Sequence, residues 1–481
     1  MGIRKHLNWS TKNYLNWFFL ALAIRTVIFI FFNFEFQQNW PDELRDSVAI
    51  FHNDSYGYYN PLESLFSGEG YVTACRMPGL VPVYCASRVF FSHPNAIIFI
   101  VLLQVIIGAI SVVALATAAY KLIASELAFK IVFFTYAISS FVTIWDHAAL
   151  SDSFSVSFMV FALYFLVKLK QELHWKNALL FGLFFAWSVF HRPAHIVAFP
   201  LLFFFIFSIK GITLGAFRMA IYYSIIGILP FLIFDAIWVG YNFQKTKRVV
   251  FLQDEDRVCF QALADHHVAT RNFVIGRGGD YKEWSRNTEL AWIMDGDTAS
   301  KFSFNESYFT PKYGMDSLNT LKKYYTQSND SAATEIERQD AISRVENLAL
   351  NMNNDYKMER KFDYYFLNRI KLILLFAFSG KVENLPFPAR ADTNIFEFGI
   401  KAFYVLLLHA VVLLFFFGFC YAIYSKDLGI LAISSFPIIL ILIIGAFLGY
   451  AEQRYLTPVY PFMLVVAAYF VNLFSKKRIV I

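Results

Sequence analysis

Charged side chains are scarce in this 481-residue chain. Lys, Arg, Asp and Glu together make up 16% of the residues, whereas soluble domains carry about 25%. Hydrophobic residues make up 57%, and the mean hydropathy is +0.48. Several apolar runs reach about 20 residues, the length that an α-helix needs to cross a lipid bilayer. The lack of charge therefore excludes an ordinary soluble protein and indicates a polytopic membrane protein.

Cysteines are also few, and the spacing of the four does not match a metal site; they are Cys75, Cys85, Cys259 and Cys420. A Cys75–Cys85 disulfide is compatible with a loop outside the cytoplasm. A cleavable signal peptide is not expected, because the first apolar run, 15–34, is too long and lacks a small-residue cleavage site. We expect neither a metal nor a cofactor.

The apolar runs predict ten transmembrane helices and an all-α polytopic membrane fold. They lie at 15–34, 96–119, 127–145, 150–167, 177–190, 194–209, 217–240, 400–424, 428–449 and 455–474. Basic residues before the first run and in alternate loops after it place the N-terminus in the cytoplasm. The net charge of +6 therefore reflects the basic residues of the predicted cytoplasmic loops and does not indicate a nucleic-acid partner.

Two segments are expected outside the cytoplasm. The first is the loop 35–95, with short interfacial helices, which belongs to an N-terminal catalytic membrane module, 1–240. The second is a mainly helical soluble domain, 241–398, which is followed by the C-terminal transmembrane helices of 399–481. This division predicts three parts, with the soluble domain inserted between two groups of membrane helices.

The soluble domain shows helical periodicity. Apolar residues recur with the period of one helix face at Ile342, Val345, Ala349, Met352 and Tyr356, so an amphipathic helix should cover a core there. Near the end of this domain, FLNRIKLILLFAFS (366–379) is apolar but only 14 residues long and includes two basic residues. It predicts an interfacial helix rather than a membrane span.

Polar residues gather at the predicted outer ends of the spans. The loops there contain Asp42, Glu43, Asp54, Tyr56, Arg76, Asp146, His147, Asp152, His191, Arg192, His195, Glu452, Gln453 and Arg454. Each also has a structural interpretation, since Asp is a preferred helix N-cap and arginines extend to lipid headgroups. The histidines at 191 and 195 have a spacing that suits a metal, but Pro193 interrupts the helix between them. Arg25, in the middle of the first span, is expected to face a partner inside the bundle.

The order of these residues carries a resemblance. The block NDSYGYYNPLESLFSGEGYVTACRMPGLVPVY (53–84) resembles the first extracytoplasmic loop of the GT-C superfamily of glycosyltransferases, in the branch of protein O-mannosyltransferases and aminoarabinose transferases. The matching positions are Asp54, Tyr56, Gly68, Gly70, Tyr71, Arg76, Pro78 and Gly79. Further matches are LSDSF (150–154), HRP (191–193), QRYLTPVYP (453–461) and the arginine of the first span. The resemblance covers nearly all of the transmembrane part, while 241–398 matches only in position and size.

The resemblance implies an activity. Such enzymes take a sugar from a polyprenyl phosphate, undecaprenyl or dolichyl, and pass it with inversion to an acceptor outside the cytoplasm. The acceptor is a protein, a lipid or a glycan, and membrane lipids surround the enzyme. A carboxylate that accepts the acceptor's proton contributes about 10²–10⁴-fold to the rate. We expect Asp54 in this role, with Asp42, Glu43 and Asp152 as alternative acids.

The other polar residues are expected around the donor. The lipid phosphate leaves as a dianion and needs cationic or hydrogen-bonding neighbours; the candidates are Arg76, His191, Arg192 and Arg454. Tyr56, Tyr58 and His147 are expected to position the sugar or the acceptor. An N-glycosylation sequon at Asn53 would place a glycan beside the proposed base in an endoplasmic reticulum, which favours a bacterial inner membrane with a periplasmic active site.

Two other functions remain open from the sequence. An O-antigen ligase or polymerase also uses lipid-linked sugars, but such enzymes resemble an arrangement without an acidic first loop. A transporter or flippase for polyprenyl-linked sugars would place ionisable residues near the bilayer midplane and broken helices in paired halves. A non-catalytic scaffold is a third interpretation, in which the acids of the first loop would be replaceable.

Overall fold

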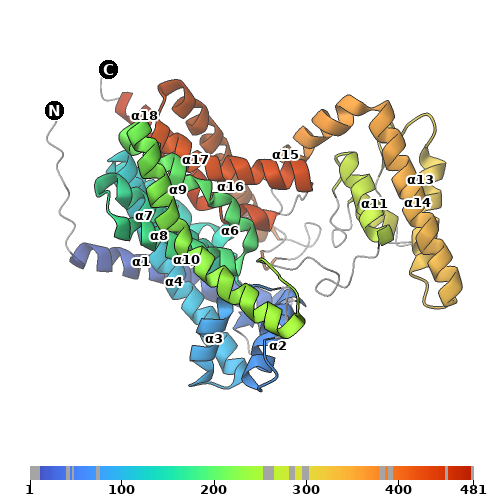
Figure 1. Ribbon diagram of the computed structural model, residues 1–481, viewed down its shortest axis with the longest axis horizontal. Coiled ribbons are helices and arrows are strands. Elements are labelled where there is room, and N and C mark those ends of the chain that lie inside the picture. The colour runs from blue at the N-terminus through green and yellow to red at the C-terminus, as the bar shows by residue number, and fades with distance from the viewer. Residues whose placement is uncertain are drawn as a thin grey trace. The chain divides into compact units, whose positions relative to one another are not determined.

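The computed structural model describes residues 11–39, 44–45, 48–51, 53–71, 76–252, 265–280, 288–294, 303–378, 385–387, 394–449 and 453–477. This part of the chain is mainly helical and divides into two compact units (Figure 1). The first unit holds Met1–Asp254, Gly380–Pro437 and Thr457–Ile481, and the second holds Glu255–Ser379 and Ile438–Leu456. The second unit therefore combines most of the predicted soluble domain with a stretch that the sequence assigned to the C-terminal membrane helices.

Long helices make up most of the first unit. They are α1 (Thr11–Asn39), α4 (His93–Ile123), α5 (Glu126–Ile138), α7 (Asp152–Gln171), α8 (Trp175–His191), α9 (Pro200–Lys210), α10 (Leu214–Thr246), α16 (Ile395–Ser425), α17 (Leu428–Ile441, whose last residues belong to the second unit) and α18 (Tyr460–Lys477). α7 packs on α4 and on α8, and α8 packs on α10. α18 packs on α16 and α5, and α1 packs on α4. Segments far apart in sequence thus form one helical bundle.

The bundle confirms an all-α membrane fold. Among the described residues, seven helices are long and apolar enough to cross a membrane, and an eighth span results if α5 and the segment Ser140–Asp146 count as one bent span. The bend is 49° and follows Ser139, whose backbone is extended. Helices α8 and α18 cover two further predicted spans, and the number of ten spans stays a prediction.

Helix ends follow local sequence signals. Ser125 begins α5 by accepting a hydrogen bond from the amide of Ala128, and Thr213 caps α10 in the same way. Between α8 and α9, Arg192 is extended because it precedes a proline. A 3₁₀ helix, η4 (Pro193–Ala198), follows. The predicted helix break at HRPAH is therefore present.

Glycines bring two helices together. A Cβ atom added to Gly182 of α8 would lie 2.0 Å from the carbonyl oxygen of Gly227 of α10. The two backbones are thus in direct contact, which is typical of helix pairs in membranes because small residues permit close approach.

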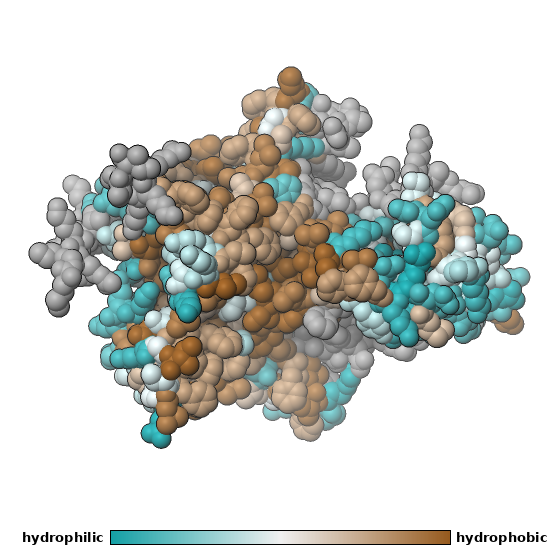
Figure 2. Space-filling view, turned by 90° about the horizontal axis from the view of Figure 1, so that it is seen from above, coloured by the Kyte–Doolittle hydropathy of each residue, from teal (hydrophilic) through white to brown (hydrophobic). Residues whose placement is uncertain are grey.

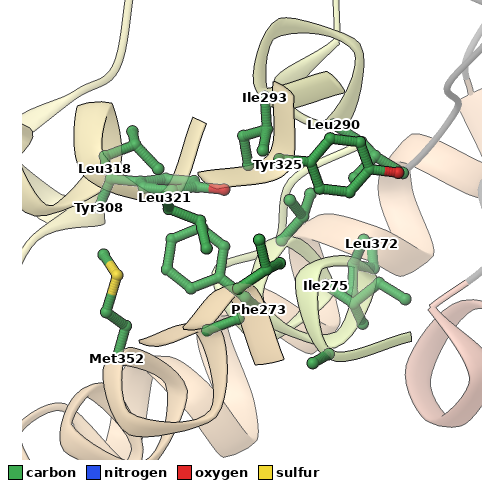
Figure 3. Close-up of a cluster of buried hydrophobic side chains, with 14 residues drawn as sticks. Phe273, Ile275, Leu290, Ile293, Tyr308, Leu318, Leu321, Tyr325, Met352 and Leu372 are labelled. Carbon is green, nitrogen blue, oxygen red and sulfur yellow. The ribbon is translucent and has the colours of Figure 1, made fainter. Parts of the chain in front are cut away.

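The second unit has its own hydrophobic core. It contains α11 (Asp265–Gly276), α12 (Glu289–Met294), η5 (Glu306–Tyr308), α13 (Met315–Ser328), α14 (Glu335–Glu359), η6 (Asp363–Leu367), α15 (Asn368–Phe378), η7 (Leu442–Leu448) and η8 (Gln453–Leu456). Phe273, Leu321 and Met352 point toward one another in this core (Figure 3). The amphipathic helix predicted around residue 349 is confirmed as α14, where Val345, Ala349, Met352 and Tyr356 are buried while Ile342 is half-buried.

A buried arginine links three elements of this core. The guanidinium of Arg277 donates to the carbonyl oxygens of Phe273, Tyr308 and Met352 at 2.9–3.1 Å. Its carbon lies 3.9 Å from the centre of the Phe273 ring. Burial lowers the pKa of Arg277 to about 10, so the side chain stays charged at neutral pH. The residue therefore acts as a structural connector of α11, η5 and α14.

The surfaces of the two units differ in polarity. Figure 2 shows a largely hydrophobic surface over the long helices of the first unit and a largely hydrophilic surface over α13 and α14. Lipid-facing helices need an apolar exterior, while a hydrophilic exterior requires water. Membrane helices and a water-exposed helical part are therefore both present.

Candidate functional site

Several loops of the first unit meet at one end of the bundle. Because successive long helices run in opposite directions, the C-terminal end of α1, the connections 144–152 and 191–195, and the end of α10 all lie at this end. The connection from α1 to α4 contains β1 (Leu44–Arg45), β2 (Ala49–Ile50), α2 (Asn53–Phe66), η2 (Pro78–Leu80) and α3 (Val81–Arg88). The residues that the sequence grouped as catalytic candidates are distributed over these loops.

Asp54 lies in the first turn of α2 and forms an ion pair. Its Oδ1 accepts a hydrogen bond from Nη2 of Arg76 at 2.9 Å. The Asp54 side chain is 36% exposed and that of Arg76 is 14% exposed. The positive end of the helix dipole also favours a carboxylate at this position. The Asp54 side chain thus lies beside a guanidinium and within reach of solvent.

Arg76 lies along one side of α2. Its guanidinium carbon is 4.8 Å from the centre of the Tyr58 ring, a cation–π distance. A Cβ atom added to Gly57 would lie 3.3 Å from Nε of Arg76, so the glycine leaves room for the arginine. The first-loop block therefore brings Asp54, Tyr58 and Arg76 together, while Tyr56 is exposed and packs edge-on against Phe51 at 4.7 Å.

Tyr58 connects this group to the membrane helices. The hydroxyl of Ser151 hydrogen-bonds to the Tyr58 hydroxyl and donates to the carbonyl oxygen of His191, both at 3.0 Å. His191 ends α8, and its Nδ1 donates to the carbonyl of Trp187 at 2.8 Å. The other ring nitrogen, Nε2, is a buried acceptor without a hydrogen-bond partner among the described residues.

Arg192 forms an ion pair with Asp152, at the start of α7. The Asp152 side chain is 5% exposed and that of Arg192 is 13% exposed, so the pair is much less open than Asp54. η2 packs closely on the end of α8, just before Arg192: a Cβ atom added to Gly79 would lie 2.6 Å from the carbonyl oxygen of Phe190. Asp152 is therefore poorly accessible to an incoming molecule and anchors Arg192.

A third aspartate–arginine pair lies inside the bundle. Arg25, in the middle of α1, pairs with Asp146, which also accepts a 2.5 Å hydrogen bond from the hydroxyl of Ser153. Gly108 of α4 faces the pair, and a Cβ atom there would lie 2.8 Å from Nη1 of Arg25. The expected partner of Arg25 is thus Asp146. The sequence signal for it was the arginine itself, because a buried charge requires a partner.

The segment after Asp146 is attached to the first loop. Ile50 donates its amide proton to the carbonyl of His147 at 3.0 Å, and its own carbonyl accepts from the amide of Ala149 at 2.9 Å. We call residues 147–149 the strap. Ile50 lies four residues before Asp54, so the strap fixes the chain shortly before α2 begins.

His147 is buried beside this bridge. Its Nδ1 lies 3.0 Å from Oδ1 of Asn33, and its ring stacks on Phe29 at 4.2 Å. Burial lowers the pKa of His147 to about 3, so the ring is neutral at physiological pH and Nδ1 is the donor to Asn33. His147 therefore contributes to packing and to the strap and brings no positive charge to the site.

Other candidates lie elsewhere. Asp42, Glu43 and Glu452 lie outside the described residues, as does Cys75 of the expected disulfide. Arg454 belongs to η8 of the second unit. Nδ1 of His195 hydrogen-bonds to the Ser188 hydroxyl at 2.5 Å. The part of the chain that the structure describes contains no group of three His, Cys, Asp or Glu side chains arranged to hold a metal.

Comparison with known proteins gives no assignment: neither a protein-family model nor a curated protein matches the chain.

Proposed function

We propose that the chain is a membrane glycosyltransferase that moves a sugar from a polyprenyl phosphate to an acceptor, with Asp54 as the general base. The observation that supports it most is the group Asp54–Arg76–Tyr58 at the end of the bundle. A carboxylate open to solvent, an arginine and an aromatic ring lie together directly after a membrane span. A donor with its polyprenyl tail in lipid and its phosphate at the headgroup level would meet this group.

The proposed reaction is a single displacement. The acceptor's hydroxyl or amide attacks C1 of the sugar, and its proton passes to the Asp54 carboxylate. The bond between C1 and the phosphate oxygen breaks, and its electron pair stays on the polyprenyl phosphate. Negative charge grows on that phosphate, so a nearby guanidinium stabilises the transition state. Attack opposite to the leaving group inverts the configuration at C1.

Burial separates the roles of the acids. Asp152 and Asp146 are nearly inaccessible and paired with arginines, whereas Asp54 is more than one-third exposed. A base must come within about 3 Å of the proton that it accepts, which an open carboxylate permits. Arg76 is the first candidate for the leaving phosphate, and Arg192, held by Asp152, is the second. Arg454 stays a candidate from the resemblance alone.

The proposed compartment follows from the positive-inside pattern. The basic loops favour an orientation with the Asp54 end of the bundle away from the cytoplasm, and the proposed acceptor is then a protein, lipid or glycan of the cell envelope. We propose a bacterial inner membrane with this end in the periplasm.

The experiment compares two carboxylates on the same helix. Asp54→Asn removes the base but keeps the shape of the side chain, and transfer should fall by about 100-fold or more. Glu63→Gln is the matched control, because Glu63 also lies on α2, also pairs with an arginine (Arg88, 3.3 Å) and is similarly exposed at 41%. Its transfer should stay close to that of the wild type.

Two measurements make the test independent of the unknown sugar. Mass spectrometry of the envelope of cells without this gene should reveal a missing sugar, which the wild type and Glu63→Gln restore and Asp54→Asn does not. Purified protein in lipid nanodiscs should then release polyprenyl phosphate when it is supplied with that sugar on its polyprenyl phosphate and with envelope acceptor from the cells without this gene. If Asp54→Asn restores the sugar, Asp54 is not the general base. If loss of the gene leaves the envelope unchanged and the purified protein releases no polyprenyl phosphate, the chain is not the proposed transferase.

One observation favours a second candidate function. Ionisable residues buried among membrane helices, such as Arg25 and Asp146, are typical of transport pathways. A flippase for polyprenyl-linked sugars would move the donor across the bilayer with its sugar still attached. The nanodisc assay distinguishes the two functions, because only the transferase produces free polyprenyl phosphate.

A further inference from the structure

The second unit exposes an apolar stripe between α14 and the end of α15. Four side chains at four-residue intervals are exposed, with fractions of 39–64%: Phe362, Phe366, Ile370 and Leu374. The rings of Phe362 and Phe366 are neighbours, with centroids 5.2 Å apart. We call these four residues the 362–374 face. A soluble part would not normally leave such a row of large apolar side chains in water.

A π turn aligns this face. In an α-helix a four-residue step drifts by about 40°, so three steps would rotate the stripe by about 120°. The π turn η6 (Asp363–Leu367) contains about one extra residue, which reduces the rotation of the stripe around the helix axis by about 100°. Phe362 and Leu374 therefore share one side of the helix.

The opposite side of α15 packs against the end of a membrane span. Leu372 and Phe376 are buried, and α15 lies along η7. Gly445 of η7 touches the helix closely, since an added Cβ atom would lie 3.0 Å from Cα of Ile373. The apolar helix Leu428–Ala446 is long enough to cross a membrane and ends in η7. α15 thus packs against the end of an apolar helix that is long enough to cross a membrane.

The charge of the segment differs from that of the preceding helix. Residues 357–374 contain five basic and two acidic side chains, a net charge of +3, whereas residues 335–356 contain two basic and five acidic side chains, a net charge of −3. Tyr364 and Tyr365 lie between the basic residues, and the guanidinium of Arg369 is 5.3 Å from the Tyr364 ring. Apolar side chains with basic and tyrosine neighbours are typical of helices that lie in a membrane interface.

We propose that the 362–374 face inserts into the surface of a bilayer that contains anionic lipids. Phe362, Phe366, Ile370 and Leu374 enter the boundary between headgroups and acyl chains, and Lys361 and Lys371, both exposed, contact the anionic headgroups. Juxtamembrane basic residues are attracted to an anionic bilayer surface. This proposal concerns the attachment of the second unit and does not depend on the transferase activity.

The test uses the full chain in nanodiscs. In a variant whose four cysteines are replaced by alanine, single cysteines at Phe366, Ile370 or Leu374 carry an environment-sensitive fluorophore. Asn347, exposed on α14, is the matched control site. In discs of phosphatidylcholine with phosphatidylglycerol, a quencher attached to the lipid acyl chain should reduce the fluorescence of the three face labels several-fold. It should leave the label at Asn347 unchanged.

The charge contribution is tested by lipid composition. Quenching of the face labels should weaken in discs of phosphatidylcholine alone, and Lys361→Gln with Lys371→Gln should abolish this difference. Face labels that respond to the lipid quencher no more than the Asn347 label would overturn the proposal. Equal quenching in both kinds of disc would overturn its anionic specificity. Neither readout requires activity, so failure here leaves the proposed function unaffected.

Discussion

The buried pair of Arg25 and Asp146 permits a prediction that separates stability from positioning. Their side chains are 1% and 4% exposed. In Arg25→Met the carboxylate of Asp146 would keep the hydroxyl of Ser153 at 2.5 Å but lose its opposite charge. An unpaired buried charge costs about 3–5 kcal/mol, so the free energy of unfolding should fall by that amount.

The double variant should behave differently. Arg25→Met with Asp146→Leu removes both charges and fills the site with apolar atoms, which is often neutral or stabilising for a buried pair. The free energy of unfolding should then return to within about 1 kcal/mol of the wild-type value. Reversible unfolding of the full chain in mixed micelles measures all variants, including Asp146→Leu alone. Single-variant effects that simply add in the double variant would refute the coupling.

In the double variant, the rate of sugar transfer should not recover even though the stability does. Asp146 directly precedes the strap, which holds Ile50 and thereby the start of α2. Without the ion pair and the bond to Ser153, this connection loses its anchor in the bundle. Misplacement of a catalytic group by about 1 Å costs about 100-fold in rate, so the double variant should be stable but about 10- to 100-fold slower in sugar transfer. A stable double variant with wild-type transfer would limit the pair to a stabilising role.

Two further substitutions test the contacts around α8. Arg192→Lys keeps the positive charge but loses the planar fork against Asp152. Nanodisc turnover should fall by about tenfold, while thermal unfolding shows that the protein still folds. Unchanged turnover would leave Arg192 as a headgroup anchor. Gly79→Ala places a Cβ atom about 2.6 Å from the carbonyl oxygen of Phe190, which should destabilise the bundle by about 1–3 kcal/mol. A variant with wild-type stability would show that η2 moves away from α8 without cost.

The sequence predicted helices better than contacts between them. The apolar period around Ala349, the break before Pro193 and the long apolar runs all have their signal within a few residues, and each corresponds to an observed helix or helix end. The bend at Ser139 and the π turn at 363–367 have no comparable signal. Both are local departures from regular helix geometry, which a period of apolar residues does not encode.

The ion pairs show the same limit. Arg192 was expected at a lipid phosphate, which stays a prediction, and only the fold shows that it also pairs with Asp152, 40 residues away. Arg25 was expected to have a partner, yet only the fold identifies Asp146, 121 residues away. Asp54 and Arg76 were both found from the first-loop block, because they lie in the same loop. Local motifs thus identified candidate residues, while their pairing required the arrangement of the bundle.

The three aspartate–arginine pairs described in the first unit differ most in how easily they separate. Breaking a buried pair costs several kcal/mol, which suits Arg25–Asp146 and Arg192–Asp152 as fixed points of the bundle. The side chain of Asp54 is 36% exposed, against 4% for Asp146 and 5% for Asp152, so water can replace part of its contact with Arg76 when this pair separates. If a sugar-linked lipid phosphate enters as proposed, Arg76 would gain its phosphodiester anion as a partner, and Asp54 would lose a neighbouring cation. A carboxylate that loses a neighbouring cation is a better proton acceptor, which is what the proposed base would need at that step. The donor itself would in this way activate the base, and the two buried pairs would keep the loop in place while this exchange occurs.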